Sequence, residues 1–325
     1  MIFNTLDEIK GPVSQELIRF DKHFREAIAS RVSLLDKISY YIVKTKGKQF
    51  RPIITLLSAK TLGEVNDNTL TAATMVELLH TATLVHDDVV DDSDQRRGFY
   101  SINALWKNKI AVLVGDYLLS RGLLVALDRD RFDMLKVLSK AVTDMSEAEL
   151  LQLEKARRLD IDEEIYFEII RKKTASLIAA AVSCGALSIT SDSDVLERMH
   201  RFGMELGTAF QIKDDLMDLS GHSIGKPLIN DIKEKKMTLP LILSLKNAPS
   251  GESRQVVRRI RSDSLDKNVI ADTVKFIFQY QGVDQAIQRM NWHRDQALSI
   301  LSTFPQNEAR QALEGLCRFV TEREK

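Results

Sequence analysis

Apolar and polar positions repeat with a helical period along most of this chain. Apolar residues recur at spacings of three and four through residues 11–43, 52–62 and 68–86, which predicts helices there. The same pattern predicts further helices at about 101–127, 133–157, 162–189, 193–219 and 238–246. No strand-like alternation of useful length interrupts them, so the pattern favours an all-helical chain.

Some helices can be interpreted further. The segment "SINALWKNKIAVLVGDYLLSRGLLVAL" is apolar nearly all round, which is typical of a helix at the centre of a bundle. The run "LIAAAVSCGALSI" is short for a membrane span of roughly 20 residues and is better interpreted as a buried helix. Asn68 or Thr69 is the expected N-cap of the helix over 68–86. The only long interior stretch that must be a loop is "SGHSIGKPLINDIKEKKMTLP".

Composition agrees with long helices and a single domain. The chain has 325 residues and only six prolines, none of them between Pro52 and Pro227. Because proline breaks helices, that span can hold several long ones, and no linker divides it. We therefore expect one all-α domain over residues 1–325, a large helical bundle around a central cavity.

Charge and cysteine content exclude some classes of protein. Lys plus Arg equals Asp plus Glu at 46 each, so there is no basic excess that would indicate a nucleic-acid partner. Cys184 and Cys317 are too few for a disulfide framework, which fits a reducing cytoplasm. The start "MIFNTLDEIKGP" carries no signal peptide pattern. We expect a cytoplasmic protein without an integral membrane segment.

Two acidic clusters with matched spacing carry the candidate chemistry. "LVHDDVVDDSDQRRG" and "FQIKDDLMDLSG" each follow an apolar run, and in each a third aspartate stands three residues after a pair. The six aspartates are Asp87, Asp88, Asp91, Asp214, Asp215 and Asp218. On a helix, carboxylates three and four residues apart share a face and repel one another, so a cation should offset them. Carboxylates and water are the preferred ligands of Mg²⁺, which often bridges protein to substrate phosphates.

The clusters can face one another across a bundle and hold several magnesium ions around a diphosphate. A single acidic run is as often a solvated helix end. The second cluster makes that alternative much weaker, because each follows an apolar run that should direct it inward.

At these residues the chain resembles the trans-prenyl diphosphate synthases, the enzymes that elongate isoprenoid chains head to tail, and in particular the long-chain type similar to octaprenyl diphosphate synthase. The resemblance covers roughly residues 40–245. It rests on motifs in the family's order: "GKQFRP", "ELLHTATLVHDDVVDDSDQRRG", "KTA", "FQIKDDLMD" and "GKP" followed by "DIKEKKMTLP". It implies the isoprenoid synthase fold and, usually, a homodimer.

The resemblance also implies a reaction. Magnesium ions on Asp87, Asp91 and Asp214, with help from the other three motif aspartates, would bind an allylic prenyl diphosphate and neutralise its charge as it leaves. The double bond of isopentenyl diphosphate would attack the allylic carbocation, and loss of a proton would leave a chain longer by one five-carbon unit. No side chain is assigned as the base, because the departing diphosphate is often proposed for that role.

Substrate-binding residues follow from matching positions. The resemblance assigns isopentenyl diphosphate to Lys48, Arg51, His80 and Arg97. It assigns the allylic diphosphate to Arg96, Lys173, Thr174, Gln211, Lys226 and Lys236, with Arg96 and Lys173 also counted as catalytic because they would stabilise the leaving group. The family usually has glycine where this chain has Lys235, which leaves open whether Lys235 or Lys236 reaches substrate. Asp92 is an additional acid that we expect to face solvent.

Product length should depend on the residues one turn before the first motif. Ala82 and Thr83 would form the wall of the pocket, and neither is an aromatic residue of the kind that blocks growth in short-chain members. From Asp87 back to Met75 a helix rises about 18 Å, which leaves a long apolar route. We expect a product of six to ten isoprene units, the side-chain precursor of a respiratory quinone.

Two other functions fit part of the sequence. "ELLH" at 77–80 and "ERMH" at 197–200 are Glu-x-x-His pairs of the kind used by di-iron bundles, with Glu147 or Glu149 and Glu168 as further ligands. That oxidoreductase would leave both aspartate motifs without a role. A terpene cyclase of the same fold is the second alternative, although cyclases commonly lack the isopentenyl-binding lysine and arginine.

Overall fold

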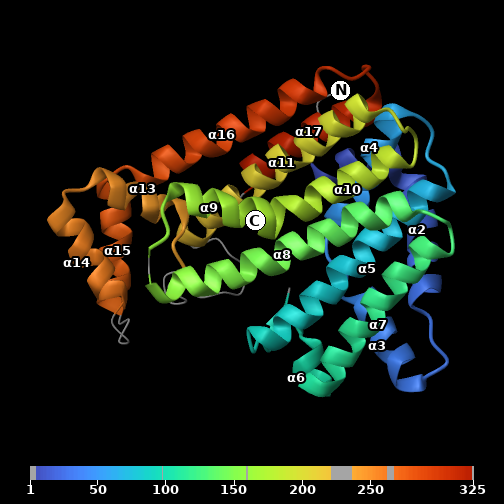
Figure 1. The fold of residues 1–325 in the computed structure, drawn as a ribbon, viewed down its shortest axis with the longest axis horizontal. Helices are drawn as coiled ribbons and strands as arrows, with labels where there is room; N and C mark the ends of the chain where they lie inside the picture. Colours follow the sequence, from blue (N-terminus) through green and yellow to red (C-terminus); the bar gives the residue numbers. More distant parts are fainter. Residues whose placement is uncertain (1–4, 97, 159, 221–235, 262–266, 324–325) are drawn as a thin grey trace. The chain divides into compact units, whose positions relative to one another are not determined.

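The computed structural model describes residues 5–96, 98–158, 160–220, 236–261 and 267–323, and these are almost entirely helical (Figure 1). The prediction of an all-α chain is confirmed. The helices are α1 (Leu6–Lys10), α2 (Ser14–Ile28), α3 (Ser33–Lys44), α4 (Phe50–Leu62), α5 (Asp67–Val90), α6 (Ile102–Trp106), α7 (Asn108–Leu127), α8 (Phe132–Arg158), α9 (Glu163–Ile170), α10 (Ser176–Leu187), α11 (Ser193–Ser220), α13 (Leu239–Asn247), α14 (Ser250–Arg261), α15 (Lys267–Gln279), α16 (Gly282–Leu301) and α17 (Glu308–Glu322). A 3-10 turn η1 (Gly11–Val13), a π-helical turn η2 (Arg171–Ala175) and the antiparallel strands β1 (Gln95–Arg96) and β2 (Phe99–Tyr100) complete the described elements.

The chain divides into two compact units. Unit 1 comprises residues 1–140, 180–200 and 301–315, and unit 2 comprises residues 141–179, 201–300 and 316–325. The expectation of a single domain over residues 1–325 stays a prediction.

Helix α5 lies at the centre of unit 1, where it packs against α4 and α7. Its residues Leu70, Met75 and Leu78 are almost wholly buried. The helix begins at a capping box, in which Asn66 Oδ1 accepts hydrogen bonds from the backbone N–H groups of Asn68 and Thr69 at 2.9 and 3.2 Å. The N-cap is therefore Asn66, and the predicted cap at Asn68 or Thr69 is wrong by two or three residues. The backbone N–H groups of Asn68 and Thr69 are themselves capped by the Asn66 side chain, so both residues lie inside the helix.

Two predicted helices are interrupted. Residues 29–32 separate α2 from α3, since the backbone turns extended at Ala29. Lys107 separates α6 from α7, because its φ of 74° lies in the left-handed region and cannot continue a helix. Neither break shows in the apolar periodicity, which runs through both segments.

Helix α7 is not the buried centre of a bundle, so that prediction is wrong. Its apolar residues cover every side, yet only one face packs on α5, and Leu113 and Leu124 keep 56% and 43% of their surface exposed. Among the described helices it is the one that is long and apolar enough to cross a membrane by length and composition alone. A core helix of a soluble protein passes the same test. By contrast, α10 is buried as predicted, from Leu177 through Val182.

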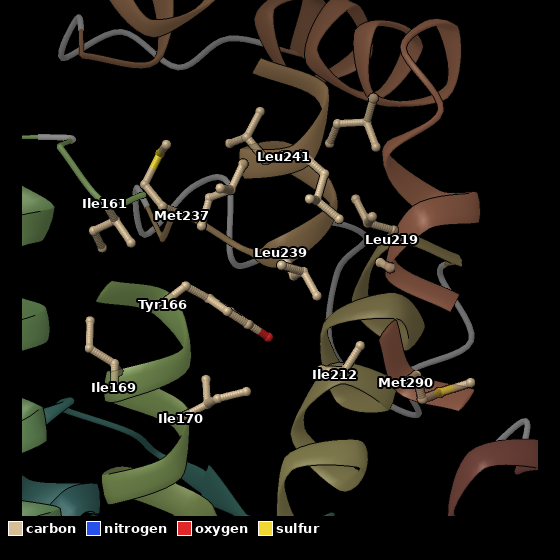
Figure 2. Packing of buried hydrophobic residues seen from close by; sticks show 14 of the residues in the cluster. Ile161, Tyr166, Ile169, Ile170, Ile212, Leu219, Met237, Leu239, Leu241 and Met290 are labelled. Atoms are coloured by element: carbon tan, nitrogen blue, oxygen red, sulfur yellow. The ribbon is translucent and has the colours of Figure 1, made fainter. Parts of the chain in front are cut away.

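Unit 2 has an apolar core built from α9, α11, α13 and the helices beside them (Figure 2). In Figure 2, Tyr166 and Ile170 extend from α9 toward α11, which carries Ile212, while Leu239 and Leu241 of α13 close the other side. Pro240 stands in the first turn of α13, where its missing N–H would have no helical partner. The second aspartate motif lies on α11 beside this core.

Candidate functional site

The first aspartate motif forms the end of α5. Asp87 and Asp88 occupy its last turn, and Asp91 is the C-cap, with its N–H bonded to Asp87 O at 2.8 Å. Asp87 and Asp91 are exposed, one turn apart, whereas Asp88 is only 4% exposed. Asp92 is exposed, as expected. The first and third aspartates are thus exposed to solvent, while the second is held within unit 1.

Asp88 is held by an arginine from the segment that follows. Arg96 Nε donates a 2.7 Å hydrogen bond to Asp88 Oδ1. The arginine returns to the helix end because β1 and β2 form a hairpin that pairs Arg96 with Phe99, and Gly98 supplies the positive φ of its turn. Asn103 Nδ2 also donates to the Asp88 carbonyl at 3.2 Å. Arg97 lies outside the described residues.

Arg51 and His80, both assigned to isopentenyl diphosphate, lie together in unit 1. Arg51 NH1 is 2.8 Å from His80 Nε2. Because a guanidinium only donates, Nε2 accepts and the ring proton resides on Nδ1. Lys48 is exposed in the loop between α3 and α4, three residues before Arg51. Lys46 instead binds Asp21 of α2 at 2.6 Å, which fixes the loop.

A cavity of about 90 Å³ in unit 1 adjoins these groups. Its polar lining includes His80, Asp88 and Arg96. Its apolar walls come from α2, α3 and β2 through Phe20, Phe24, Tyr41, Phe99 and Tyr100. Three of the residues predicted from sequence therefore line one cavity.

The second aspartate motif forms the last turns of α11. Asp214 keeps 43% of its side chain exposed and Asp218 is half-buried, whereas Asp215 is 5% exposed. Arg323, just beyond α17, binds Asp214 and stacks 4.2 Å from the centre of the Phe210 ring. As in the first motif, the second aspartate is the buried one.

Three donors hold Asp215. The Tyr166 hydroxyl donates to Oδ2 at 2.7 Å, Gln211 Nε2 donates to Oδ1 at 3.1 Å, and the Leu239 N–H approaches Oδ2 at 3.4 Å. They come from α9, α11 and the start of α13. A buried carboxylate is costly unless it is well hydrogen-bonded, and this one is.

Lys173 and Thr174 lie in the π-helical turn η2, a kind of local widening that often marks functional positions. Thr174 Oγ1 donates to Gln211 Oε1 at 2.7 Å, and Lys173 Nζ donates to Gln152 at 3.0 Å and pairs with Glu149. The "KTA" motif is thus tied to the second aspartate motif through Gln211.

Close helix packing makes this link possible. Gly203, Gly207 and Gln211 form one stripe on α11, and a Cβ on either glycine would collide with Ala179 or Ala175. The absence of side chains there brings the α11 backbone close to η2 and the start of α10. Gln211, one turn further on, consequently meets Thr174.

A second cavity, of about 190 Å³, lies in unit 2. Five residues predicted from sequence line it: Lys173, Thr174, Gln211, Asp215 and Lys236. Lys226 and Lys235 lie outside the described residues. Of the chain-length residues, Ala82 is buried, and Thr83 is half-buried with its hydroxyl bonded to His80 O at 2.9 Å.

The carboxylates of the two aspartate motifs suit a divalent cation that is bound by the protein and by a substrate's phosphate oxygens together. Within the described ranges, no group of three or more His, Cys, Asp or Glu side chains is placed to hold an ion by itself. Mg²⁺ commonly binds through one or two carboxylates and completes its shell with water and phosphate oxygens. Asp87 with Asp91, and Asp214 with Asp218, offer pairs of that kind.

The di-iron alternative is not supported. His80 Nε2 is engaged by Arg51, and His200 Nδ1 lies 3.2 Å from Ser183 Oγ. The proposed bridging glutamates bind lysines instead, as when Glu168 accepts a 2.9 Å hydrogen bond that raises the pKa of Lys172. Glu147 and Glu149 pair with Lys172 and Lys173.

Sequence reasoning missed two residues of these sites. Arg323 is 109 residues from Asp214, and Tyr166 is 49 from Asp215, so no local spacing connects them. Tyr166 follows the N-cap of α9 in an apolar run and looks like any core residue.

Comparisons with known proteins agree with these motifs. Residues 32–277 match the family described as Polyprenyl synthetase. An all-trans-nonaprenyl-diphosphate synthase (geranyl-diphosphate specific) of Rhodobacter capsulatus is 37% identical over 327 residues, covering 99% of both chains. The octaprenyl diphosphate synthase of Escherichia coli (strain K12) is 33% identical over 322 residues, covering 98% of this chain and 99% of that one.

Solved structures lead to the same family. A decaprenyl diphosphate synthase from Rhodobacter capsulatus superposes with a TM-score of 0.93 at 32% identity, covering 99% of this chain and 100% of that one. A polyprenyl synthase from Caulobacter crescentus CB15, complexed with calcium and isoprenyl diphosphate, gives 0.91 at 31% identity over 100% of both chains. The chain belongs to the polyprenyl synthetase family and is a prenyltransferase.

Proposed function

We propose that this enzyme condenses isopentenyl diphosphate head to tail with an allylic prenyl diphosphate and repeats the step to make a long-chain polyprenyl diphosphate. The proposal rests on one recurring arrangement. In each unit an aspartate motif ends a long helix and lies beside cationic or amide donors suited to phosphate oxygens. Relatives named nonaprenyl, octaprenyl and decaprenyl diphosphate synthase support a long product.

Unit 2 is the proposed site of the allylic diphosphate. Lys173, Thr174, Gln211 and Lys236 line one cavity there, and the N–H groups of the two lysines and Gln211 would bind its oxygens, while the Thr174 O–H donates to Gln211. Lys226 has the same proposed role by resemblance. Arg323 would have to release Asp214 before that carboxylate could face a metal-bound diphosphate.

Unit 1 is the proposed site of isopentenyl diphosphate, through Lys48, Arg51, His80 and Arg97. The contact between Arg51 and His80 supports this, because it holds two donors of the set side by side. Arg96, bonded to Asp88, would act on the allylic diphosphate as it leaves. We propose that both aspartate motifs act on that same diphosphate.

Magnesium is the proposed metal, held by Asp87, Asp91 and Asp214 with help from Asp218. Bound there, it would supply positive charge to the leaving diphosphate. The calcium and isoprenyl diphosphate in the Caulobacter crescentus structure support a divalent ion with a diphosphate substrate in the family.

The proposed reaction breaks the allylic C–O bond, and its electron pair goes to the diphosphate. Arg96 and Lys173 stabilise the negative charge that develops. The double bond of isopentenyl diphosphate then supplies the electrons of the new C–C bond. A proton from the resulting cation passes to the released diphosphate, which restores a double bond and needs no side-chain base.

Chain length would be set on α5. Ala82 is small and buried one turn and a half before Asp87, so the wall beside the growing chain carries no bulky block at that position. We propose a product of six to ten isoprene units that serves as a quinone side chain.

We further propose a cytoplasmic homodimer. The two cysteines, both buried and neither in a disulfide, fit a reducing compartment. The outer face of α7 supports a second copy, since its exposed leucines and valine form an apolar surface of the kind that obligate interfaces cover. These residues are Val112, Leu113, Leu123, Leu124 and Leu127.

Labelled isopentenyl diphosphate tests the proposal when it is incubated with farnesyl diphosphate, Mg²⁺ and the purified enzyme. The hydrolysed products, sized by reversed-phase chromatography, should contain six to ten isoprene units. Products of only three or four units would contradict the long-chain assignment, and cyclic hydrocarbons would favour the cyclase.

A further inference from the structure

We infer that Tyr166 is a positioning residue for the allylic diphosphate site. It acts through the buried carboxylate of Asp215, which it orients by a hydrogen bond. This deepens the proposed function and rests on it. It assigns a role to a residue that no motif in the sequence includes. It also separates Asp215 from Asp214 and Asp218, which are less buried.

The environment of Asp215 distinguishes it from a metal ligand. Its side chain is 5% exposed, against 43% for the side chain of Asp214 on the same turn of α11. Both of its oxygens already accept hydrogen bonds from protein donors. A carboxylate committed in this way is suited to orienting its neighbours rather than to binding an ion.

Tyr166 supplies the shortest of these bonds. Its hydroxyl donates to Asp215 Oδ2 at 2.7 Å, and the residue is 4% exposed. The ring lies in the apolar cluster of unit 2 (Figure 2). It also makes an edge-on contact with Phe167, with 5.4 Å between the ring centroids. An O–H group donating to a carboxylate in a dry environment is among the stronger hydrogen bonds in proteins.

From Asp215 the network continues to the diphosphate donors. Gln211 gives its NH₂ group to Asp215 Oδ1, so its carbonyl oxygen is left to accept from Thr174 Oγ1 at 2.7 Å. The amide orientation of Gln211 is thus set by the charge on Asp215. Tyr166 and Thr174 lie eight residues apart in one segment, so two bonds fasten α9 and η2 to α11.

The consequence is a specific geometry for the cavity of about 190 Å³ in unit 2. Tyr166, Asp215, Gln211 and Thr174 all line it, and Lys173 is next to Thr174. Without the Tyr166 hydroxyl, Asp215 loses a donor and can rotate toward Gln211 or the backbone of Leu239. Either rotation disturbs the amide that orients Thr174.

The test compares Tyr166→Phe with Tyr280→Phe. The control removes a tyrosine hydroxyl that also donates to a carboxylate at 2.7 Å, that of Glu252, but at the surface. Binding of inorganic pyrophosphate in the presence of Mg²⁺ is measured by titration calorimetry on the full chain. Removing an outer hydrogen-bond partner of this kind typically costs about 10-fold or more in affinity, and we expect that loss for Tyr166→Phe and none for Tyr280→Phe.

Kinetics separate positioning from general destabilisation. Tyr166→Phe should raise the KM for the allylic substrate and lower kcat while leaving the KM for isopentenyl diphosphate unchanged, because the donors proposed for that substrate are in unit 1. Wild-type values for pyrophosphate affinity and allylic KM in a folded Tyr166→Phe protein would overturn the inference. Equal increases in both KM values would also overturn it.

A second variant keeps the inference testable if Tyr166→Phe does not fold. If Tyr166→Phe is too unstable, Tyr166→Phe with Asp215→Asn removes the charge that needed the lost donor. Because Asp215→Asn can weaken binding by itself, the double variant is compared with Asp215→Asn alone, and pyrophosphate binding that is equally weak in both, about 10-fold below wild type, supports the inference. Wild-type binding by the folded double variant overturns it. A wild-type enzyme that neither binds Mg²⁺-pyrophosphate nor forms product would instead sink the proposed function, and this inference with it.

Discussion

Arg96 donates from Nε to Oδ1 of Asp88 at 2.7 Å, and so pairs the first arginine after the acidic motif with its one buried carboxylate. Arg96 belongs to strand β1 of the hairpin with β2, and this hairpin holds it beside the end of α5. Asp88 is therefore oriented before any substrate binds, while Asp87 and Asp91 remain exposed at the end of α5.

Arg96→Gln should reduce both stability and activity. The substitution leaves a buried carboxylate without its charged donor, which costs about 2 kcal/mol, and removes a cation from the leaving diphosphate. Thermal unfolding and the rate of product formation check this. Arg19→Gln is the matched control, since Arg19 pairs with Asp67 at the surface of the same unit. Equal melting temperatures for the two variants would show that the Asp88 contact is not needed for stability.

Ala82→Phe should shorten the product. A phenyl group at this buried position of α5 would close the route along which the chain is proposed to grow. Chromatography of the hydrolysed products gives the length distribution directly. Ala271→Phe, at an exposed position of α15, provides the control and should leave the distribution unchanged. An unchanged distribution for Ala82→Phe would place the pocket wall elsewhere.

Asp133 should make stability depend on pH. Its hydrogen bonds from Arg131, at 2.9 and 2.6 Å, lower the pKa of the carboxyl group. A lowered folded-state pKa means that the stabilisation is present above the unfolded-state pKa and is lost as pH falls through the folded-state value. Because Asp133 is 43% exposed, the effect should stay within about 1 kcal/mol.

The measurement for that pair is the melting temperature of Asp133→Asn at two pH values. It should lie below wild type at pH 7, and the difference should shrink as the pH falls below the ordinary pKa of about 3.9 and through the lowered pKa of the folded state. Asp36→Asn, exposed on α3, is the control. A difference that persists unchanged at low pH would mean that the ion pair is not its origin.

Leu113→Glu should dissociate the proposed dimer. Leu113 is 56% exposed on the apolar face of α7, and burying a glutamate there without a partner is costly. Light scattering after size exclusion should give a dimer mass for wild type and a monomer mass for the variant. Ile18→Glu, on α2 at 67% exposure, should remain dimeric. A monomeric wild-type protein would refute the dimer.

Sequence reasoning predicted most of the helices and the local motifs. It failed where the structure depends on contacts between residues far apart in the sequence or on the backbone angle of a single residue. The two aspartate motifs could be found because their spacing is local and each ends an apolar helix. The break at Lys107 could not, because a single positive φ leaves no mark on apolar periodicity. The exposed face of α7 could not be predicted from the sequence either, because leucines on every side of the helix do not indicate which side packs against other helices.

The same limit applies to the site. Resemblance indicated Thr174 and Gln211 separately, but their 2.7 Å bond depends on Gly203 and Gly207 bringing two helices close. Tyr166 carries no local signal, because its partner is 49 residues away. Residues that recognise a ligand often lie in motifs, whereas residues that orient them are found only once the chain is folded.

Both aspartate motifs are proposed to act on one metal-bound diphosphate. Release of pyrophosphate from farnesyl diphosphate and isopentenyl diphosphate, measured against Mg²⁺ concentration for wild type, Asp87→Asn and Asp214→Asn, tests this proposal most directly. Either substitution should lower the rate by at least about 100-fold and shift the magnesium requirement upward. If one variant keeps the wild-type rate and magnesium dependence, the two motifs do not act on the same diphosphate.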